Sequence, residues 1–292
     1  MERDHNGYIS PLSTRYASSE MQYLFSESNK FRTWRKLWIA LAKAEHQLGL
    51  GVTAEQIAQL EAHADDINFE VAQAREKIVR HDVMSHVYAY GQQCPDAEAI
   101  IHLGVTSCYV GDNTDIIILR DASKLILKKA AQVLRNLAAF AREYKDLPCL
   151  GYTHLQPAQL TTVGKRATLW MNELVMDIEN LEFQLSTLRM RGAKGTTGTQ
   201  ASFMELFDGD EHKVKELERL IAEQMGFDRS IAVAGQTYSR KVDAYFLGAL
   251  SGFAQSACKF ATDLRILMSF EEMEEPFEKN QIGSSAMPYK RN

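Results

Sequence analysis

The stretch PAQLTTVGKRATLWMNELVMDIENLEFQLSTL, residues 157–188, decides the fold because its apolar residues recur every three or four positions. This spacing places them on one face of an α-helix, and a proline is favoured in the first helical turn. The stretch therefore predicts a long helix that begins near Pro157. Its apolar stripe consists of Leu160, Val163, Ala167, Trp170, Leu174, Ile178, Leu181, Leu185 and Leu188.

Two further segments, residues 112–146 and a stretch that begins near Thr237, show the same periodicity. Each of the three segments predicts a helix about 45–52 Å long, at ~1.5 Å per residue. The stripes are close to heptad spacing, so we expect the helices to pack nearly parallel or antiparallel, as in a bundle. Three such helices leave apolar surface uncovered, which predicts further helices from partner chains or from additional sequence.

Shorter helices are predicted outside the three long segments. Residues 20–50 have helical spacing, a second helix covers 68–91 and ends at Gly91, and a third covers 211–225. Thr53, with a glutamine three residues on, has the spacing of a capping box. Strand signals are nearly absent.

The pattern predicts an all-α protein with two domains. Residues 92–111 break the helical periodicity and resemble a boundary loop. We therefore expect an N-terminal helical domain over 1–111 and a long-helix bundle domain over 112–292.

Composition limits the classes of protein that this chain can belong to. Hydrophobic residues make up 45% and charged residues 24%, which is typical of a globular protein. The net charge of −5 gives no basic field for nucleic acid, and no apolar run is long enough to span a bilayer. The first residues, MERDHNGYISPLS, have no apolar core typical of a secretory signal. The four cysteines are scattered, which fits a reducing compartment. These features predict a cytosolic protein.

Two polar segments precede the first long helix, where anions could bind. In RHDVMSH (80–86), Arg80 and His81 could hold an anion and Asp82 could orient a ring nitrogen. The alternative is a solvated polar helix face. In HLGVTSCYVGDNTD (102–115), Thr106 and Ser107 lie just ahead of the helix, whose N-terminus attracts carboxylates and phosphates. The alternative there is a helix cap formed by Asp112.

Two later segments could carry proton transfer. His154 in GYTHLQPAQ (151–159) is expected beside the N-terminus of the second long helix, which would make it a better proton donor. A structural histidine is the alternative. In GSSAMPYKRN (283–292), Ser284, Lys290 and Asn292 combine a hydroxyl, a cation and an amide, which together suit a carboxylate, although an ordinary turn is the alternative. The acidic run EEMEE (271–275) before it is expected to be a solvated helix end.

These segments resemble a known family. GSSAMPYKRN matches every fixed position of the pattern Gly-Ser-Ser-x-Met-Pro-x-Lys-x-Asn, which is the signature loop of the fumarase/aspartase superfamily. Within that superfamily the chain resembles the adenylosuccinate lyases of the animal type. The motifs that carry this resemblance are TRYAS (14–18), RHDVM (80–84), TSCYVGDNTD (106–115), THLQPAQLTTVGKR (153–166), KGTTGTQASF (194–203) and GQTYSRKVD (235–243).

The resemblance implies a fold, a reaction and an assembly. The fold would be all-α and fumarase/aspartase-like, with the bundle at the centre of a homotetramer and active sites built from several subunits. The reaction would be β-elimination of fumarate from adenylosuccinate, giving AMP, and from SAICAR, giving AICAR, in purine biosynthesis. No metal or organic cofactor is implied.

The resemblance also implies residue roles. Ser284 matches the general base and His154 the general acid, while Lys290 could stabilise the serine alkoxide or hold the substrate. The matching positions for substrate binding are Arg15 and Tyr16 for the phosphate, Arg80, His81, Asp82, Thr106, Ser107 and Gln236, with Lys290 and Asn292 on the signature loop.

Family members continue beyond the signature loop with more core helices and a third domain. We therefore expect this chain to be a fragment with little or no activity. Two other functions stay open. One is another fumarate-releasing lyase of the argininosuccinate lyase, fumarase or aspartase type. The other is a structural homologue without catalysis, as the lens crystallins related to argininosuccinate lyase are.

Overall fold

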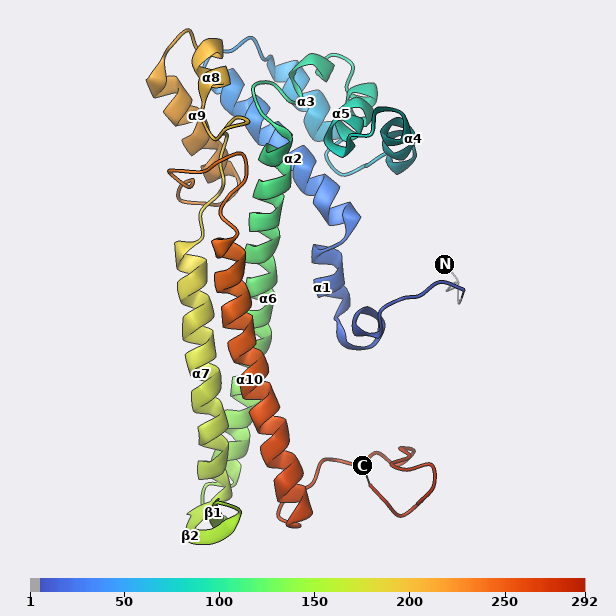
Figure 1. Ribbon diagram of the computed structural model, residues 1–292, viewed down its shortest axis with the longest axis vertical. Helices are drawn as coiled ribbons and strands as arrows, with labels where there is room; N and C mark the ends of the chain where they lie inside the picture. The colour runs from blue at the N-terminus through green and yellow to red at the C-terminus, as the bar shows by residue number, and fades with distance from the viewer. Residues whose placement is uncertain (1–5, 292) are drawn as a thin grey trace. The chain divides into compact units, whose positions relative to one another are not determined.

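The computed structural model describes residues 6–291 (Figure 1). Helices dominate, which confirms the all-α fold class, and a two-stranded hairpin is the exception in this part of the chain. The chain forms two compact units. The first combines the residues up to Lys129 with Leu181–Phe246, and the second combines Ala130–Asn180 with the residues from Leu247 onward. The domain boundary that the sequence predicts near residue 111 stays a prediction.

The three long helices that the periodicity predicts are present. They are α6 (Ser107–Glu143), α7 (Val163–Thr187) and α10 (Lys241–Ser269). No described helix is long and apolar enough to cross a membrane. Because α6 begins at Ser107, Asp112 lies inside the helix and does not cap it. The buried Asp112 carboxylate instead accepts a hydrogen bond from the Tyr238 N–H at 2.7 Å.

A β-hairpin occupies the segment where we expected α7 to begin. Strand β1 (Pro148–Thr153) pairs antiparallel with β2 (Gln156–Thr162), and the register shifts between Gly151 and Tyr152. Pro157 therefore lies in a strand, and the predictions of a helix start there and of no strands were wrong. The physical reason is that β2 pairs with residues that precede it, whereas helical periodicity reports only on the segment itself.

The second unit has its own small core, at the hairpin end of the long helices (Figure 1). The Trp170 ring packs edge-on against Phe260, with ring centroids 4.8 Å apart, and its Nε1–H donates to Asp263 at 2.9 Å. These contacts join α7 to α10 on one side of the core. The buried residues are Ala141, Ala167, Trp170 and Leu267, and the hydrophobic residues packed on them are Leu137, Phe140, Met171, Phe260 and Met273.

The first unit holds the shorter helices. Its capping box at Thr53 is confirmed, with both reciprocal hydrogen bonds to Gln56 present. The helix predicted over 20–50 is broken at Ser26, which caps the second of two helices. The elements of this unit, besides the parts of α6, α7 and α10 that it contains, are η1 (Leu12–Tyr16), α1 (Ser19–Leu24), α2 (Glu27–Gln47), α3 (Ala54–Ala62), α4 (Phe69–Val79), α5 (Asp82–Gln93), η2 (Glu98–Ile100), α8 (Ala201–Leu206) and α9 (Glu211–Gln224).

The helix predicted over 68–91 is also two helices. It breaks at Arg80, whose left-handed backbone (φ 53°) ends α4, and α5 then continues past Gly91 to Gln93. His81 caps α5, because its Nδ1 accepts a hydrogen bond from the Met84 N–H at 3.3 Å. This break places the RHD segment at a junction between two helices and exposes it to solvent.

Candidate active site

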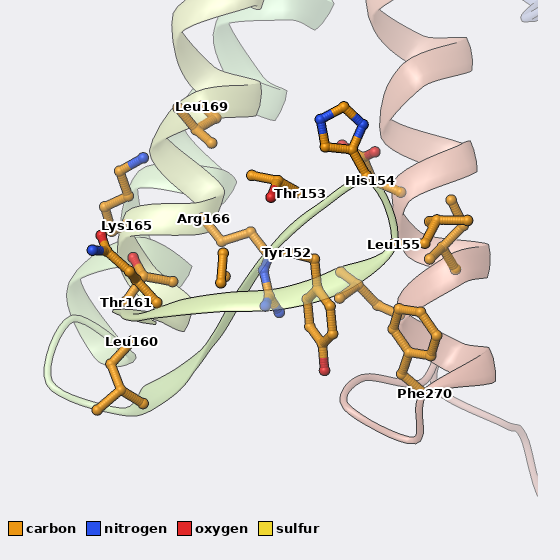
Figure 2. A pocket seen from close by; sticks show the side chains of 16 residues that line it. Tyr152, Thr153, His154, Leu155, Leu160, Thr161, Lys165, Arg166, Leu169 and Phe270 are labelled. Carbon is orange, nitrogen blue, oxygen red and sulfur yellow. The ribbon is translucent and has the colours of Figure 1, made fainter.

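His154 lies in a pocket of about 650 Å³ in the second unit (Figure 2). The hairpin forms one wall, and the first turns of α7 and the last turns of α10 form the others. Lys165 and Arg166 line the same pocket as the imidazole, and because the Arg166 charge is paired with Glu272, Lys165 is the cation that can hold an anionic group there. The residues that line it are Gly151, Tyr152, Thr153, His154, Leu155, Ala158, Gln159, Leu160, Thr161, Lys165, Arg166, Leu169, Asp263, Ile266, Leu267 and Phe270.

The backbone at His154 is unusual. His154 and Leu155 form the two-residue turn of the hairpin, and both have positive φ, at 51° and 60°. Two positive φ values mark a type I′ turn, which normally takes Asn-Gly. Such backbone conformations in residues other than glycine cost about 1–3 kcal/mol each and cluster at functional sites.

His154 is not beside a helix N-terminus, as the sequence led us to expect. The helix α7 begins only at Val163, and strand β2 separates the two. The hairpin turn, rather than a helix dipole, therefore decides where the imidazole points. Figure 2 shows His154 and Leu155 together at the tip of the hairpin.

An ion pair beside the pocket involves a residue that we expected to be solvated. Glu272 follows α10 and pairs with Arg166 at 2.9 Å, and their side chains are only 18% and 13% exposed. The Tyr152 hydroxyl donates to the other Glu272 oxygen at 2.8 Å. The expectation of a solvated helix end was therefore wrong for Glu272, since α10 ends at Ser269 and Glu272 contacts the hairpin, whereas Glu271, Glu274 and Glu275 are exposed.

The signature segment lies outside the pocket that contains His154. The Ser284 side chain is half-buried, and its Oγ accepts a hydrogen bond from the Met287 N–H at 3.1 Å. Lys290 is exposed, and its N–H donates to the Met287 carbonyl at 3.0 Å. Asn292 lies outside the described residues. The structure of this single chain thus does not bring Ser284 and His154 to one pocket.

In the first unit the structure brings His81, Asp82 and Ser107 together. Because His81 Nδ1 accepts from a backbone N–H, the neutral ring carries its proton on Nε2. That nitrogen lies 3.4 Å from the Ser107 Oγ, at the start of α6. Asp82 lies 3.8 Å from His81 Nδ1, and it also accepts from the Val83 N–H. A polar group can therefore contact the His81 ring and the α6 N-terminus at once.

Thr106 adds a polar group without a partner to this cluster. Its hydroxyl oxygen is buried and has no hydrogen bond within residues 6–291. Buried hydroxyls nearly always have a partner. The Thr106 hydroxyl therefore fits a contact to a ligand.

The remaining predicted binding residues lie elsewhere on the first unit. Arg15 and Tyr16 are exposed on η1, and in the described part of the chain neither side chain has a hydrogen-bond or ion-pair partner. Gln236 is exposed, and its carbonyl accepts from the Arg191 guanidinium at 2.6 Å. The guanidinium of the fully buried Arg191 also donates to the carbonyls of Lys194 and Gly195. It therefore joins the loop that contains these two residues to the loop that contains Gln236. No sequence motif singled it out.

The described residues contain no group of three or more His, Cys, Asp or Glu side chains arranged to hold a metal. A family model described as lyase matches residues 14–292, and the chain therefore belongs to this family, within the fumarase/aspartase superfamily.

Relatives in this family are named for a particular reaction. The chain is 56% identical to adenylosuccinate lyase of Saccharomyces cerevisiae and 53% identical to that of Schizosaccharomyces pombe, in each case over 99% of this chain and 61% of the relative. It is 52% identical to adenylosuccinate lyase of Schistosoma mansoni, over 98% of this chain and 60% of that protein. The chain thus spans about three fifths of the length of these relatives.

Solved structures share the fold. A fumarate lyase from Mesorhizobium sp. BNC1 superimposes with a TM-score of 0.76 at 25% identity, over 88% of this chain and 59% of that chain. The 3-carboxy-cis,cis-muconate lactonizing enzyme from Pseudomonas putida superimposes with a TM-score of 0.77 at 24% identity, over 89% of this chain and 59% of that chain. The latter likeness concerns the fold alone.

Proposed function

We propose that the protein catalyses β-elimination of fumarate from adenylosuccinate, giving AMP, and from SAICAR, giving AICAR. The observation that carries the proposal is the hairpin pocket, where a strained turn presents His154 and Lys165 also lines the wall. The names of relatives that are 52–56% identical support adenylosuccinate as a substrate, and SAICAR follows from the resemblance of the sequence motifs to the family. A substrate with two carboxylates and a phosphate needs several cationic contacts, although the net charge of the chain is −5.

The elimination needs a base and an acid. Ser284 removes the proton from the succinyl Cβ, the electron pair of that C–H bond forms the C=C bond of fumarate, and the C–N bond breaks. His154 donates a proton to the departing nitrogen. A serine hydroxyl is a poor base at neutral pH, so its alkoxide needs stabilisation. The Met287 N–H that binds Ser284 Oγ supports this role for the loop.

Substrate binding is assigned to the first unit and to the signature loop. His81 Nε2–H and the Ser107 hydroxyl are assigned to the succinyl carboxylates, together with Thr106, whose buried hydroxyl has no partner within residues 6–291. Arg80, Asp82 and Gln236 complete this set, Arg15 and Tyr16 bind the phosphate, and Lys290 and Asn292 bind from the loop.

We further propose that the active protein is a cytosolic homotetramer whose active sites combine residues from several subunits. Ser284 and His154 of one chain do not share a pocket, which supports active sites built from several subunits. All four cysteines are free, which supports a reducing compartment such as the cytosol.

The test is fumarate release, followed by ultraviolet absorbance. We suggest measuring it with this chain and with a chimera that continues the chain with the remaining sequence of the yeast relative. We expect adenylosuccinate and SAICAR to be cleaved by the chimera. In the chimera, His154→Gln and Ser284→Ala should each lower kcat by about 10²–10⁴-fold.

Matched variants make the residue assignments specific. Ser285→Ala removes the neighbouring exposed hydroxyl, and His212→Gln removes an exposed imidazole on α9; both should leave kcat nearly unchanged. If His154→Gln and Ser284→Ala also leave kcat unchanged, the roles are wrong. Release of fumarate from argininosuccinate, malate or aspartate, but not from adenylosuccinate, would show one of the other superfamily lyases. No release from any substrate would favour a structural homologue.

A further inference from the structure

A cluster formed by Tyr152, Arg166 and Glu272 joins three separate segments of the second unit. Glu272 Oε2 accepts from Arg166 Nη2 at 2.9 Å, and Oε1 accepts from the Tyr152 hydroxyl at 2.8 Å. Tyr152 belongs to β1, Arg166 to the first turn of α7, and Glu272 to the segment that follows α10. Both oxygens of one carboxylate are therefore used to hold different elements.

Further contacts reinforce the same junction. The Arg166 guanidinium also donates to the Leu150 carbonyl on β1 at 2.7 Å. The Phe270 ring stacks on the Tyr152 ring, with centroids 4.9 Å apart. Figure 2 shows the Arg166 and Phe270 side chains on either side of Tyr152 of the hairpin. Hydrogen bonds between ionised groups that are largely shielded from water are stronger than neutral or exposed ones.

Two of the three joined segments carry a residue that the proposed mechanism uses. Tyr152 lies two positions before His154 on the hairpin. Glu272 lies near the start of the segment that follows α10 and contains Ser284. We propose that Glu272 is a positioning residue. Its carboxylate clamps the start of the segment 270–291, which contains Ser284, to the hairpin that presents His154. The catalytic part of this inference rests on the proposed function, but the clamp itself does not.

Both segments need such an anchor. An isolated two-stranded hairpin is only marginally stable in water, and this one ends in a turn with two left-handed residues other than glycine. Residues 270–291 contain no helix or strand in the described part of the chain, so contacts near their start determine where the segment leaves the bundle. One carboxylate that holds both segments makes their positions interdependent.

The first experiment measures the clamp without any catalysis. Hydrogen exchange is followed in the chain for the hairpin, 148–162, and for 270–291. In Glu272→Gln we expect exchange to rise roughly tenfold in both segments, which is the change for loss of a hydrogen bond to a charged group. Tyr152→Phe removes one hydrogen bond and no charge, so it should raise exchange in the hairpin by less. The control Glu275→Gln, at an exposed neighbouring carboxylate, should leave both segments unchanged.

The second experiment asks whether the clamp positions catalytic groups. In the chimera, Glu272→Gln should lower kcat by about tenfold to a hundredfold while KM stays within about twofold. The reason is that misplaced catalytic side chains slow the chemical step without weakening substrate binding. Tyr152→Phe should lower kcat less, and Glu275→Gln should not lower it.

Each outcome decides a separate claim. Unchanged hairpin exchange in both Glu272→Gln and Tyr152→Phe would overturn the clamp, whatever the enzyme does. If Glu272→Gln unfolds the second unit, Tyr152→Phe alone decides the same question. If Glu272→Gln changes hydrogen exchange but leaves kcat unchanged, the positioning role is refuted, and the clamp between the two segments still stands. A chimera without fumarate release contradicts the proposed function, and the exchange result still stands.

Discussion

Glu45, on α2, is a fully buried carboxylic acid, and both its oxygens lack a hydrogen-bond partner in the described part of the chain. Burial raises the pKa of its carboxyl to about 9, whereas the unfolded chain has a value of about 4.3. The native state therefore keeps a proton that the unfolded state releases. Stability from this residue is complete below about pH 4.3 and is lost as the pH rises towards 9.

Glu45→Gln, which is neutral at every pH, should remove this dependence. Between about pH 5 and about pH 8 the unchanged chain should lose up to about 1.4 kcal/mol of unfolding free energy per pH unit from this residue. We expect the variant to be clearly more stable than the unchanged chain at about pH 8 and similar at about pH 5. Urea unfolding followed by the fluorescence of Trp34 and Trp38, in the same unit, measures the difference.

The control is Glu70→Gln, an exposed carboxylate at the start of α4. It should keep the pH dependence of the unchanged chain. If Glu45→Gln also kept it, Glu45 would have to be ionised in the folded protein, and an unseen partner for its charge would be required.

At the scale of residues, sequence motifs single out His154 and Ser284 but not Glu272. The motifs are local strings, so a hydroxyl in Gly-Ser-Ser or an imidazole before Pro157 can be recognised within a few positions. The partners of Glu272 lie 106 and 120 positions away in the chain. An acidic run gives no sign of such partners, because most acidic runs are solvated.

The same distinction between local and distant contacts applies to whole elements. The capping box at Thr53 could be predicted because both reciprocal hydrogen bonds join residues three positions apart. The start of α7 could not, since the segment around Pro157 pairs with β1, and only the partner strand shows this. The break at Arg80 was also missed, because histidine is not among the preferred helix caps.

The junction between α6 and α7 leads to a stability prediction for these elements. A Cβ on Gly164 would lie 2.3 Å from the Ala141 carbonyl oxygen and 2.7 Å from the Lys145 Cα. Both are backbone atoms, so neither can move aside cheaply. Gly164→Ala should therefore lower the unfolding free energy by about 1–3 kcal/mol, which thermal unfolding of the chain would measure.

The matched control is Gly248→Ala, inside α10, where a Cβ would meet nothing within 4 Å. Alanine is favoured over glycine in a helix interior by about 0.5–1 kcal/mol. The control should thus leave stability unchanged or raise it. Equal destabilisation by both substitutions would contradict the close approach at Gly164.

For the molecule as a whole, the remaining question is what covers the long helices. On α7, Leu169, Met176 and Phe183 are 48%, 61% and 62% exposed. They recur at a spacing of seven, so they lie in a stripe along one face of the helix. Large apolar side chains gathered on one exposed face mark an interaction surface. The proposed homotetramer requires further copies of the chain to cover this face.

Met176→Glu tests self-association, because it places a charge at the centre of this stripe. Light scattering should give a mass several times the 33.0 kDa of one chain for the unchanged protein. For Met176→Glu we expect a mass close to that of a single chain, since an unpaired charge buried in an interface costs several kcal/mol. Glu182→Lys, at an exposed position of α7 outside the stripe, should keep the large mass. A mass of one chain for the unchanged protein would mean that α7 is not covered by further copies, and the homotetramer would then lose its physical basis in this chain.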